Sequence, residues 1–229
     1  MLHSRGDSAQ NRTSTSSIRL RARIQLRAFN ILYHRGAIWY DFVARAAFGD
    51  DWAAWRSAAA QLIVGRQVLD LGCGTGALVA GLGRQGVPVI GVDRSDAMLD
   101  VARRRDVGST HRLVRADASA LPFRAHAFDS VVSTFPARFI LEVDVAREIG
   151  RVLRPGGVIV VLAGGHLDRW RWWQAPRRLL LWLVYGRGRD GPKVGPPDVN
   201  LLEGGSFHGR WLEVFGPQGR GWVWLGRID

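Results

Sequence analysis

The sequence predicts an α/β fold with a doubly wound, mostly parallel sheet, helices on both faces and a C-terminal antiparallel hairpin. Short apolar runs alternate with helical segments between residues 65 and 163, which is the order of successive βαβ units. These runs are apolar throughout, as expected for strands that helices cover on both faces. Two further candidate strands, 210–215 and 221–228, are joined by a Gly/Pro turn and predict the hairpin.

The core elements follow from this alternation. Strands are expected at 68–71, 87–92, 111–114, 128–134 and 158–163, and helices at 77–84, 96–105 and 143–153. Ser95 is the expected N-cap of the second of these helices because its hydroxyl can accept from a free backbone N–H. Pro155–Gly156–Gly157 is expected to end the third helix.

The segments on either side of the sheet core allow the whole chain to be divided into predicted parts. Residues 1–29 are polar, then arginine-rich, and predict a disordered basic tail with the start of a helix. Residues 30–229 predict a single domain: N-terminal helices over 30–64, the sheet core over 65–163, and an insertion with the final hairpin over 164–229. A break at Gly49–Asp50 separates two N-terminal helices, the second spanning 51–62.

Composition narrows the classes of function. The net charge of +12 and pI of about 11.4 raise nucleic acid or an anionic membrane as partners. However, all but one of the 32 basic residues are arginine, and they are scattered among abundant Ala and Gly, so a general surface property is favoured. A single cysteine excludes a disulfide framework and a cysteine-clustered metal site. No window is apolar enough to span a membrane.

Residues 68–76, Val-Leu-Asp-Leu-Gly-Cys-Gly-Thr-Gly, predict a binding site at a strand end. Gly72, Gly74 and Gly76 permit positive φ angles and a close approach of ligand to backbone. The helix that follows offers free N–H groups. Asp93, at the end of the next strand, can accept from both hydroxyls of a ribose.

This loop alone leaves NAD as an alternative, since Gly72, Gly74 and Ala77 also match the dinucleotide fingerprint. Three further features favour a cationic ligand with an adenosine part. Asp70 would oppose a pyrophosphate but suits an amino group. Asp117, after the third strand, can meet an adenine amino group. The third is the segment 147–157, Arg-Glu-Ile-Gly-Arg-Val-Leu-Arg-Pro-Gly-Gly.

With these motifs, residues 68–163 resemble the class I S-adenosylmethionine-dependent methyltransferases, in the group that includes ubiquinone/menaquinone-biosynthesis and small-molecule enzymes. The matching segments, in order, are 68–76, 91–93, 115–118, 128–135 and 148–157. The resemblance implies a Rossmann-like fold with 65–163 as the cofactor-binding core and 164–229 on the substrate side. It also implies S-adenosyl-L-methionine as the cofactor.

The resemblance also implies roles for individual residues. Asp70 would lie near the amino-acid portion of the cofactor, and Asp93 would bind the ribose. The other contacts that it implies are the backbone of Gly72, Cys73 and Gly74, the adenine neighbours Arg94, Met98, Asp117 and Ala118, the methyl-side residues Ser133, Thr134 and Phe135, and a closing Tyr40 or Tyr33. Structural alternatives remain open: Met98 in the core, Gly76 and the two tyrosines in helix packing, and Cys73 as a small turn residue.

Methyl transfer is an in-line displacement whose chemistry the cofactor supplies, so a general base is optional. His166, placed just past the fifth strand, is the best candidate. A hydrophobic acceptor is expected: a quinone, a lipid or an aromatic metabolite. The Trp/Arg-rich segment 169–189 is a lid, core packing or a membrane contact. The expected location is the cytoplasm, with peripheral membrane contact left open. The alternatives are an RNA- or DNA-directed methyltransferase and a non-catalytic binding module.

Overall fold

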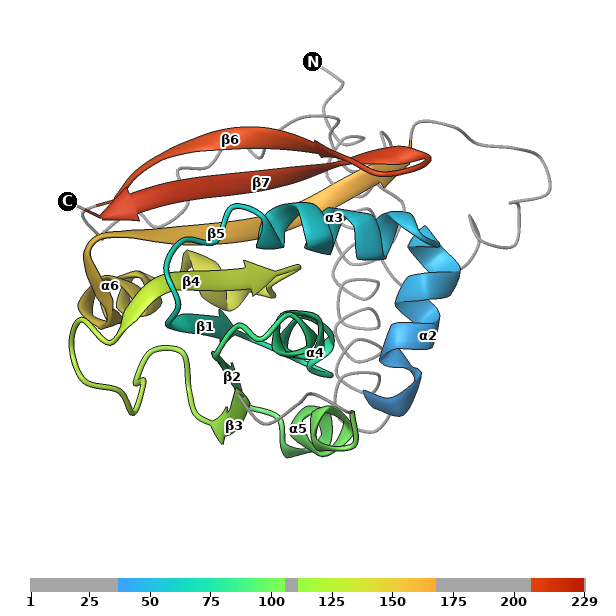
Figure 1. The fold of residues 1–229 in the computed structure, drawn as a ribbon. Coiled ribbons are helices and arrows are strands. Elements are labelled where there is room, and N and C mark those ends of the chain that lie inside the picture. Colours follow the sequence, from blue (N-terminus) through green and yellow to red (C-terminus); the bar gives the residue numbers. More distant parts are fainter. Residues whose placement is uncertain (1–36, 106–110, 168–206, 229) are drawn as a thin grey trace, which may run out of the picture.

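The computed structural model describes residues 37–105, 111–167 and 207–228. Their centre is a seven-stranded sheet in the order β3-β2-β1-β4-β5-β7-β6 (Figure 1). Strands β1 to β5 run parallel, and β7 lies antiparallel between β5 and β6. The predicted fold class is therefore confirmed. The strands are β1 (Val68–Leu71), β2 (Val89–Asp93), β3 (His111–Arg115), β4 (Phe128–Thr134), β5 (Leu153–Leu167), β6 (Phe207–Phe215) and β7 (Gly219–Ile228).

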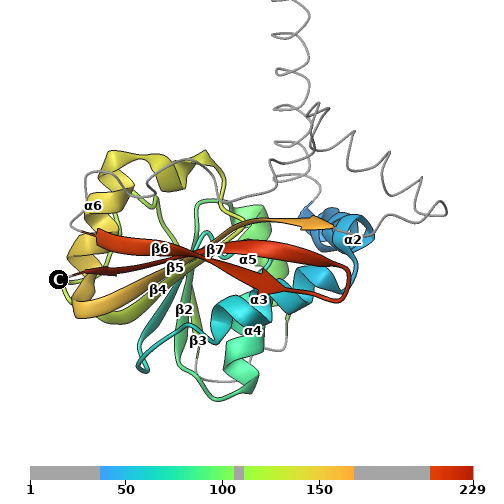
Figure 2. The ribbon, with the colours of Figure 1, turned by 90° about the horizontal axis from the view of Figure 1, so that it is seen from above.

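Helices cover both faces of the sheet, as Figure 2 shows from above. They are α2 (Ala37–Phe48), α3 (Asp51–Ala60), α4 (Ala77–Arg84), α5 (Asp96–Arg103) and α6 (Val143–Val152), with a 3₁₀ turn, η1 (Arg138–Leu141), before α6. One hydrophobic cluster joins α3, α4 and α5 to the sheet, and a second joins α6 to the opposite face. Because side chains alternate along a strand, Val68 belongs to the first cluster and Leu69 to the second.

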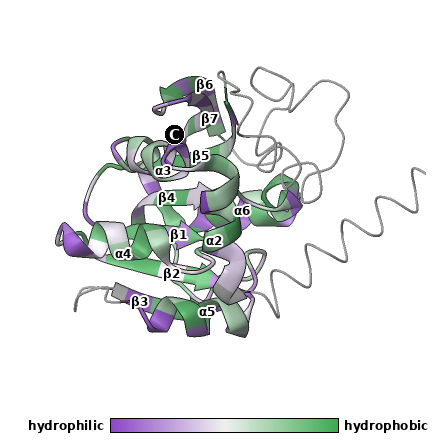
Figure 3. Cartoon of the chain, turned by 90° about the vertical axis from the view of Figure 1, so that its right-hand side faces the viewer, coloured by the Kyte–Doolittle hydropathy of each residue, from purple (hydrophilic) through white to green (hydrophobic). Residues whose placement is uncertain are grey.

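The helices are amphipathic, and Figure 3 shows both hydrophobic and hydrophilic residues on α4, α5 and α6. Their apolar sides supply the core; Ile149 and Leu99, for example, are fully buried. Ser95 caps α5 as predicted, because its hydroxyl accepts from the N–H of Met98 at 3.4 Å. Asp50 occupies the N-cap position of α3 but makes no capping hydrogen bond through its side chain.

Strand β5 differs most from its prediction. It continues past Ala163 to Leu167 because Gly164, Gly165, His166 and Leu167 keep pairing with β7. The expected position of His166, beyond the strand, is therefore wrong: it is part of β5 and pairs with Arg220. The hairpin strands are also longer than predicted, and α3 and α5 end two residues earlier than expected.

Helix α3 lies across the extended part of the sheet, and Trp55 fixes it there. The fully buried indole lies against Gly165 of β5 and Gly221 of β7, where an added Cβ would come within 2.2 Å and 3.0 Å of ring atoms. The indole N–H donates to the carbonyl of Gly219 at 3.4 Å. Asp51 accepts from the backbone N–H of Gln218 at 2.9 Å in the adjoining turn.

Some sequence predictions concern residues outside the described ranges. These are the basic tail over 1–29, Tyr33 and the Trp/Arg segment 169–189. In the described part of the chain, no helix combines the length and apolar character needed to cross a bilayer.

The contact between Trp55 and Gly165 makes a stability prediction. Gly165→Ala places a methyl group inside the indole, so we expect a loss of about 1–3 kcal/mol in the free energy of unfolding. Gly81→Ala, inside α4 with open space around the new Cβ, is the matched control and should add about 0.5–1 kcal/mol. Urea denaturation of both variants measures this, and equal stabilities would contradict it.

Candidate functional site

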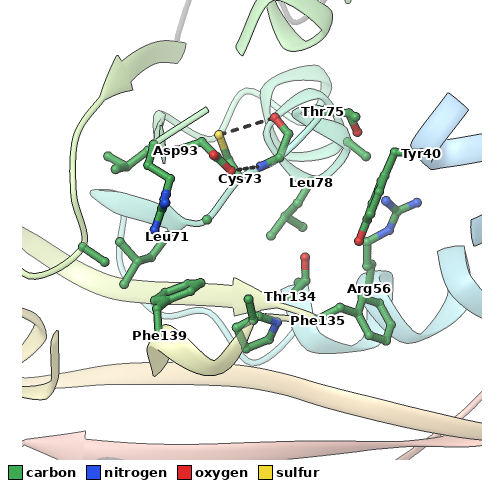
Figure 4. Close-up of a pocket in the computed structure, with 18 of the residues that line it drawn as sticks. Tyr40, Arg56, Leu71, Cys73, Thr75, Leu78, Asp93, Thr134, Phe135 and Phe139 are labelled. Carbon is green, nitrogen blue, oxygen red and sulfur yellow. Dashed lines mark hydrogen bonds between the residues drawn. The ribbon is translucent and has the colours of Figure 1, made fainter. Parts of the chain in front are cut away.

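A pocket of about 290 Å³ opens at the carboxyl ends of β1, β2 and β4 (Figure 4). Strand order reverses between β1 and β4, where sheets of this type bind ligands. The lining residues are Tyr40, Asp41, Trp52, Arg56, Leu71, Gly72, Cys73, Gly74, Thr75, Ala77, Leu78, Val92, Asp93, Arg94, Ala116, Asp117, Ala118, Thr134, Phe135, Pro136, Ala137, Phe139 and Glu142.

The glycine loop after β1 forms one wall. Gly72, Gly74 and Gly76 all have positive φ angles, as predicted. A Cβ at Gly74 would meet nothing within 4 Å, so its backbone is open to a ligand, and only the conformation demands glycine. A Cβ at Gly76 would lie 2.8 Å from that of Ala102, which shows that this glycine lets the loop pack closely on α5.

Asp93 ties the ends of β1 and β2 together. Its carboxylate accepts from the N–H of Gly74 at 2.9 Å and from the N–H of Ser95 at 2.9 Å. The side chain is buried yet lines the pocket. The structure thus brings the loop and the predicted ribose-binding acid into direct contact, and the ribose role stays a prediction.

Asp70 belongs to β1, two residues before the glycine loop, and does not line the pocket. It is buried, and neither carboxyl oxygen has a hydrogen-bond partner among the described residues. Burial raises the pKa of Asp70 to about 7; the charge of Asp93 adds to this rise and that of Arg56 opposes it. An unpartnered acid at this depth is complementary to a cationic group above it.

The residues expected on the adenine side, Arg94, Asp117 and Ala118, also line the pocket. Asp117 accepts from the N–H and the hydroxyl of Ser119 at 2.9 Å and 2.7 Å, and these bonds lower the pKa of its carboxyl. The positive charge of Arg94, which is exposed, also lowers the pKa of Asp117.

Two side chains of the segment 147–157 hold the turn that follows Asp117. Glu148 accepts from the N–H of Leu121 at 2.8 Å, and Arg151 donates to the carbonyls of Leu121 and Phe123 at 3.0 Å and 2.7 Å. The two side chains also pair with each other. We call Glu148 and Arg151 with these contacts the Glu148–Arg151 bracket. It holds the turn that follows Asp117, and this is a structural reason for the segment to occur together with the other motifs.

Two sequence predictions differ from the observed positions. Met98 is fully buried in the core and is not part of the pocket lining. His166 does not line the pocket either, because it lies within β5. Cys73 lines the pocket as expected, and burial raises the pKa of its thiol, so the thiol stays protonated, as expected for a turn residue and not a nucleophile.

The sequence reasoning missed residues from the N-terminal helices. Trp52, Arg56 and Asp41 reach the pocket from α2 and α3. Asp41 accepts from Thr75 at 3.0 Å and pairs with Arg105, which also donates to the carbonyl of Thr75 at 2.5 Å. This network joins α2 to the glycine loop. Phe139 and Glu142, around η1, were missed as well.

Comparison with known proteins agrees with this geometry. Residues 69–161 match the family model described as "Methyltransferase domain". A demethylmenaquinone methyltransferase of Symbiobacterium thermophilum is 31% identical over 175 residues, covering 69% of both chains. One of Clavibacter sepedonicus is 39% identical over 112 residues, covering 48% of this chain and 46% of its own length. The match thus covers about half the length of several such relatives.

A solved structure shares the fold. Geranyl diphosphate C-methyltransferase from Streptomyces coelicolor A3(2), in complex with S-adenosyl-L-homocysteine, superposes with a TM-score of 0.52 at 14% identity, covering 77% of each chain. From these matches, the chain belongs to the class I S-adenosylmethionine-dependent methyltransferases. Within that family, its relatives include the demethylmenaquinone methyltransferases.

The residues present fit S-adenosyl-L-methionine, the cofactor of this family. The open backbone at Gly74 allows close approach, and Asp93 and Asp117, the acids expected to bind ribose and adenine, both line the pocket. The buried carboxyl of Asp70, which has no hydrogen-bond partner among the described residues, suits a sulfonium or ammonium charge.

Asp93 gives the first site prediction. Asp93→Ala should weaken S-adenosylmethionine binding by about 100-fold or more, because charge-assisted hydrogen bonds are lost. Asp96→Ala, an exposed acid on α5, is the matched control and should leave the affinity unchanged. Isothermal titration calorimetry measures both, and unchanged binding after Asp93→Ala would falsify the ribose assignment.

Asp70 gives a pH prediction. Because the folded pKa of about 7 exceeds the unfolded value near 4, the folded state keeps a proton that the unfolded state loses. Its contribution to stability is therefore present at low pH and is lost as pH rises from about 4 to about 7. Asp70→Asn should stabilise the ligand-free protein, relative to wild type, more at pH 8 than at pH 5. The difference between the two pH values should be on the order of a few kcal/mol. Urea denaturation at both pH values tests this; an equal difference would contradict it.

Proposed function

We propose that the protein transfers the methyl group of S-adenosyl-L-methionine to a small hydrophobic acceptor with a flat ring, of the quinone type. The observation that carries this proposal is an aromatic stack on the pocket wall. Phe135 stacks on Trp52 with ring centroids 3.6 Å apart and planes at 10°, and Trp52 stacks on Phe48 at 5.1 Å and 18°. A flat apolar acceptor gains favourable contacts with such a wall.

The position of the stack supports this role. Phe135 directly follows Thr134, the last residue of β4, and both line the pocket. Phe139 and Pro136 extend the apolar lining from the same segment. In Figure 4, Thr134, Phe135 and Phe139 lie along the side of the pocket opposite Asp93 and Cys73. Cofactor and acceptor would then occupy opposite sides, with Thr134 near the methyl group.

The backbone of Phe135 adds a second argument. Its φ of 51° is in the left-handed region, which is costly for a large non-glycine side chain. Backbone strain of this kind persists where surrounding contacts hold it, often at ligand sites. Here the contacts with Trp52 and Trp55 hold the ring at the pocket wall.

On the cofactor side of the pocket, we assign each residue the role expected from the sequence. Asp93 binds the ribose hydroxyls, Asp117 the adenine amino group, and Asp70 acts on the amino-acid end through its charge. Gly72, Cys73 and Gly74 supply backbone contacts, Arg94 and Ala118 border the adenine, and Tyr40 covers the cofactor from α2. All of these except Asp70 line the one pocket, which supports the set.

The cofactor supplies an electrophilic methyl group on a sulfonium sulfur. The chain's own contribution is to hold an acceptor atom in line with that methyl group and to exclude water, where positioning contributes about 7–11 kcal/mol. Names of the relatives support the acceptor class, since they are demethylmenaquinone methyltransferases. The proposal therefore favours a quinol ring over RNA, DNA or protein.

The acceptor wall can be tested at Phe135. Phe135→Leu should raise the KM for a demethylated naphthoquinol about 2- to 10-fold, because one aromatic stacking contact is lost. Affinity for S-adenosylmethionine should stay the same. Phe135→Tyr keeps the aromatic face and should retain the wild-type KM. Phe42→Leu replaces an exposed phenylalanine on α2 and is the matched control.

Transfer of labelled methyl groups identifies the acceptor class. Cell extract split into lipid, small-molecule, RNA and protein fractions is incubated with the protein and labelled cofactor. Label in the lipid or small-molecule fraction supports the proposal, whereas label confined to RNA or protein contradicts it.

A further inference from the structure

Exposed apolar side chains gather at one end of the described structure. The large apolar side chains that are exposed in the described ranges are Trp39, Phe42, Val64, Leu141, Val143 and Phe215. All of them except Val64 lie at the carboxyl end of the parallel strands, where the pocket opens. Single exposed apolar residues are ordinary on a protein surface, but a group of them at one end indicates an interaction surface.

The chain connections explain why residues from distant parts of the sequence meet at this end. Leu141 and Val143 flank Glu142, a pocket-lining residue in the segment after β4. Phe215 is the last residue of β6, which runs parallel to β5 because both strands are antiparallel to β7. It precedes the hairpin turn that contacts α3, and Figures 1 and 2 both show this turn beside the junction of α2 and α3.

Helix α2 presents the largest of these side chains. Trp39 and Phe42 are 62% and 65% exposed, and their rings meet edge to face with centroids 6.1 Å apart and planes at 81°. Residues three apart lie on the same face of a helix, so the exposed Arg45 continues this face. Since Tyr40 and Asp41 of the same helix line the pocket, the two exposed rings lie next to the pocket wall.

The charge in and before α2 is positive. Residues 8–40 contain no acid, and their basic residues apart from His34 are Arg12, Arg19, Arg21, Arg23, Arg27 and Arg35. Asp41, the one acid of α2, pairs with Arg105 and accepts from Thr75. Aromatic rings beside arginines, without an acid to compensate them, suit a bilayer with anionic headgroups.

The α6 side of the same end differs in charge. Glu142 and Asp144 are exposed there beside the two apolar residues, and Asp144 pairs with Arg147. An anionic surface would therefore approach α2 in preference to the start of α6. A second copy of the chain or another protein could bury the rings, but the arginines favour an anionic lipid surface over either.

We propose that α2 docks this end of the protein on an anionic lipid bilayer, with Trp39 and Phe42 inserted among the headgroups and the pocket turned toward the membrane. The proposal rests on the proposed function in one respect, the hydrophobic acceptor. Such an acceptor dissolves in the bilayer, so docking at this end would let it enter the pocket without crossing water.

Sedimentation of the full chain with lipid vesicles tests the proposal. Vesicles of equal parts phosphatidylcholine and phosphatidylglycerol should bind the wild type, and vesicles of phosphatidylcholine alone should bind it at least about 5-fold more weakly. Trp39→Ser combined with Phe42→Ser should weaken binding to the mixed vesicles about 10-fold or more, because two rings no longer insert. Arg45→Gln should weaken it about 2- to 5-fold.

Val64→Ser is the matched control, because Val64 is an exposed apolar residue at the other end of the sheet. Its N–H donates to Ser130 near the start of β4 at 2.9 Å. This variant should bind the mixed vesicles like the wild type. Every variant should keep the wild-type affinity for S-adenosylmethionine in isothermal titration calorimetry, since none of the changed residues lines the pocket.

Three results would overturn the proposal. One is failure of the wild type to bind the mixed vesicles, and another is equal binding by the double variant, which would place the lipid contact elsewhere in the chain. The third is a wild-type dimer in analytical ultracentrifugation that the double variant dissociates while vesicle binding is unchanged, which would assign the rings to a second copy. The vesicles contain no acceptor, so a wrong acceptor class does not affect these measurements.

Discussion

The helix side of the pocket depends on how the indole of Trp55 seats α3 on the extended strands β5 and β7. The ring has no room to approach unless Gly165, Gly216 and Gly221 lack side chains, since a Cβ at each would lie within 3.0 Å of Trp55 or Asp51. With the ring seated, its N–H reaches the carbonyl of Gly219. The buried apolar area and this hydrogen bond fix the position of the helix.

That position decides which side chains face the pocket. One helical turn along α3 from Trp52 comes Arg56, and both line the cavity while Trp55 points to the sheet. Trp52 meets Phe135 at the end of β4, so the hairpin, the helix and the end of a central strand form one packed unit. The glycine loop is held separately, by Asp93 from β2 and by the Asp41–Arg105–Thr75 network.

Local sequence was sufficient for the strands and the loop around Asp93, because apolar runs, glycines and strand-end acids sit close together along the chain. It was insufficient at Gly164–Gly165 and at Gly219, where the glycines suggested a loop and a turn. In the structure these glycines are strand residues, and Gly165 makes room for the indole of Trp55. Arg56 and Trp52 were missed for a related reason: α3 reaches the pocket through contacts with residues more than 100 positions away. Met98, which the resemblance placed beside the adenine, lies in the core, the alternative that was left open for it.

The separate support of the two walls has a consequence for how such a protein changes over time. The loop side rests on β1, β2 and the bracket of Glu148 and Arg151, whereas the aromatic side rests on α3 and its seat on β5 and β7. Substitutions at the pocket-facing positions of α3 can therefore alter the shape presented to one reactant while the other wall keeps its geometry. Single substitutions on this short helix can therefore change which acceptor is bound, provided that the glycines in contact with Trp55 are retained.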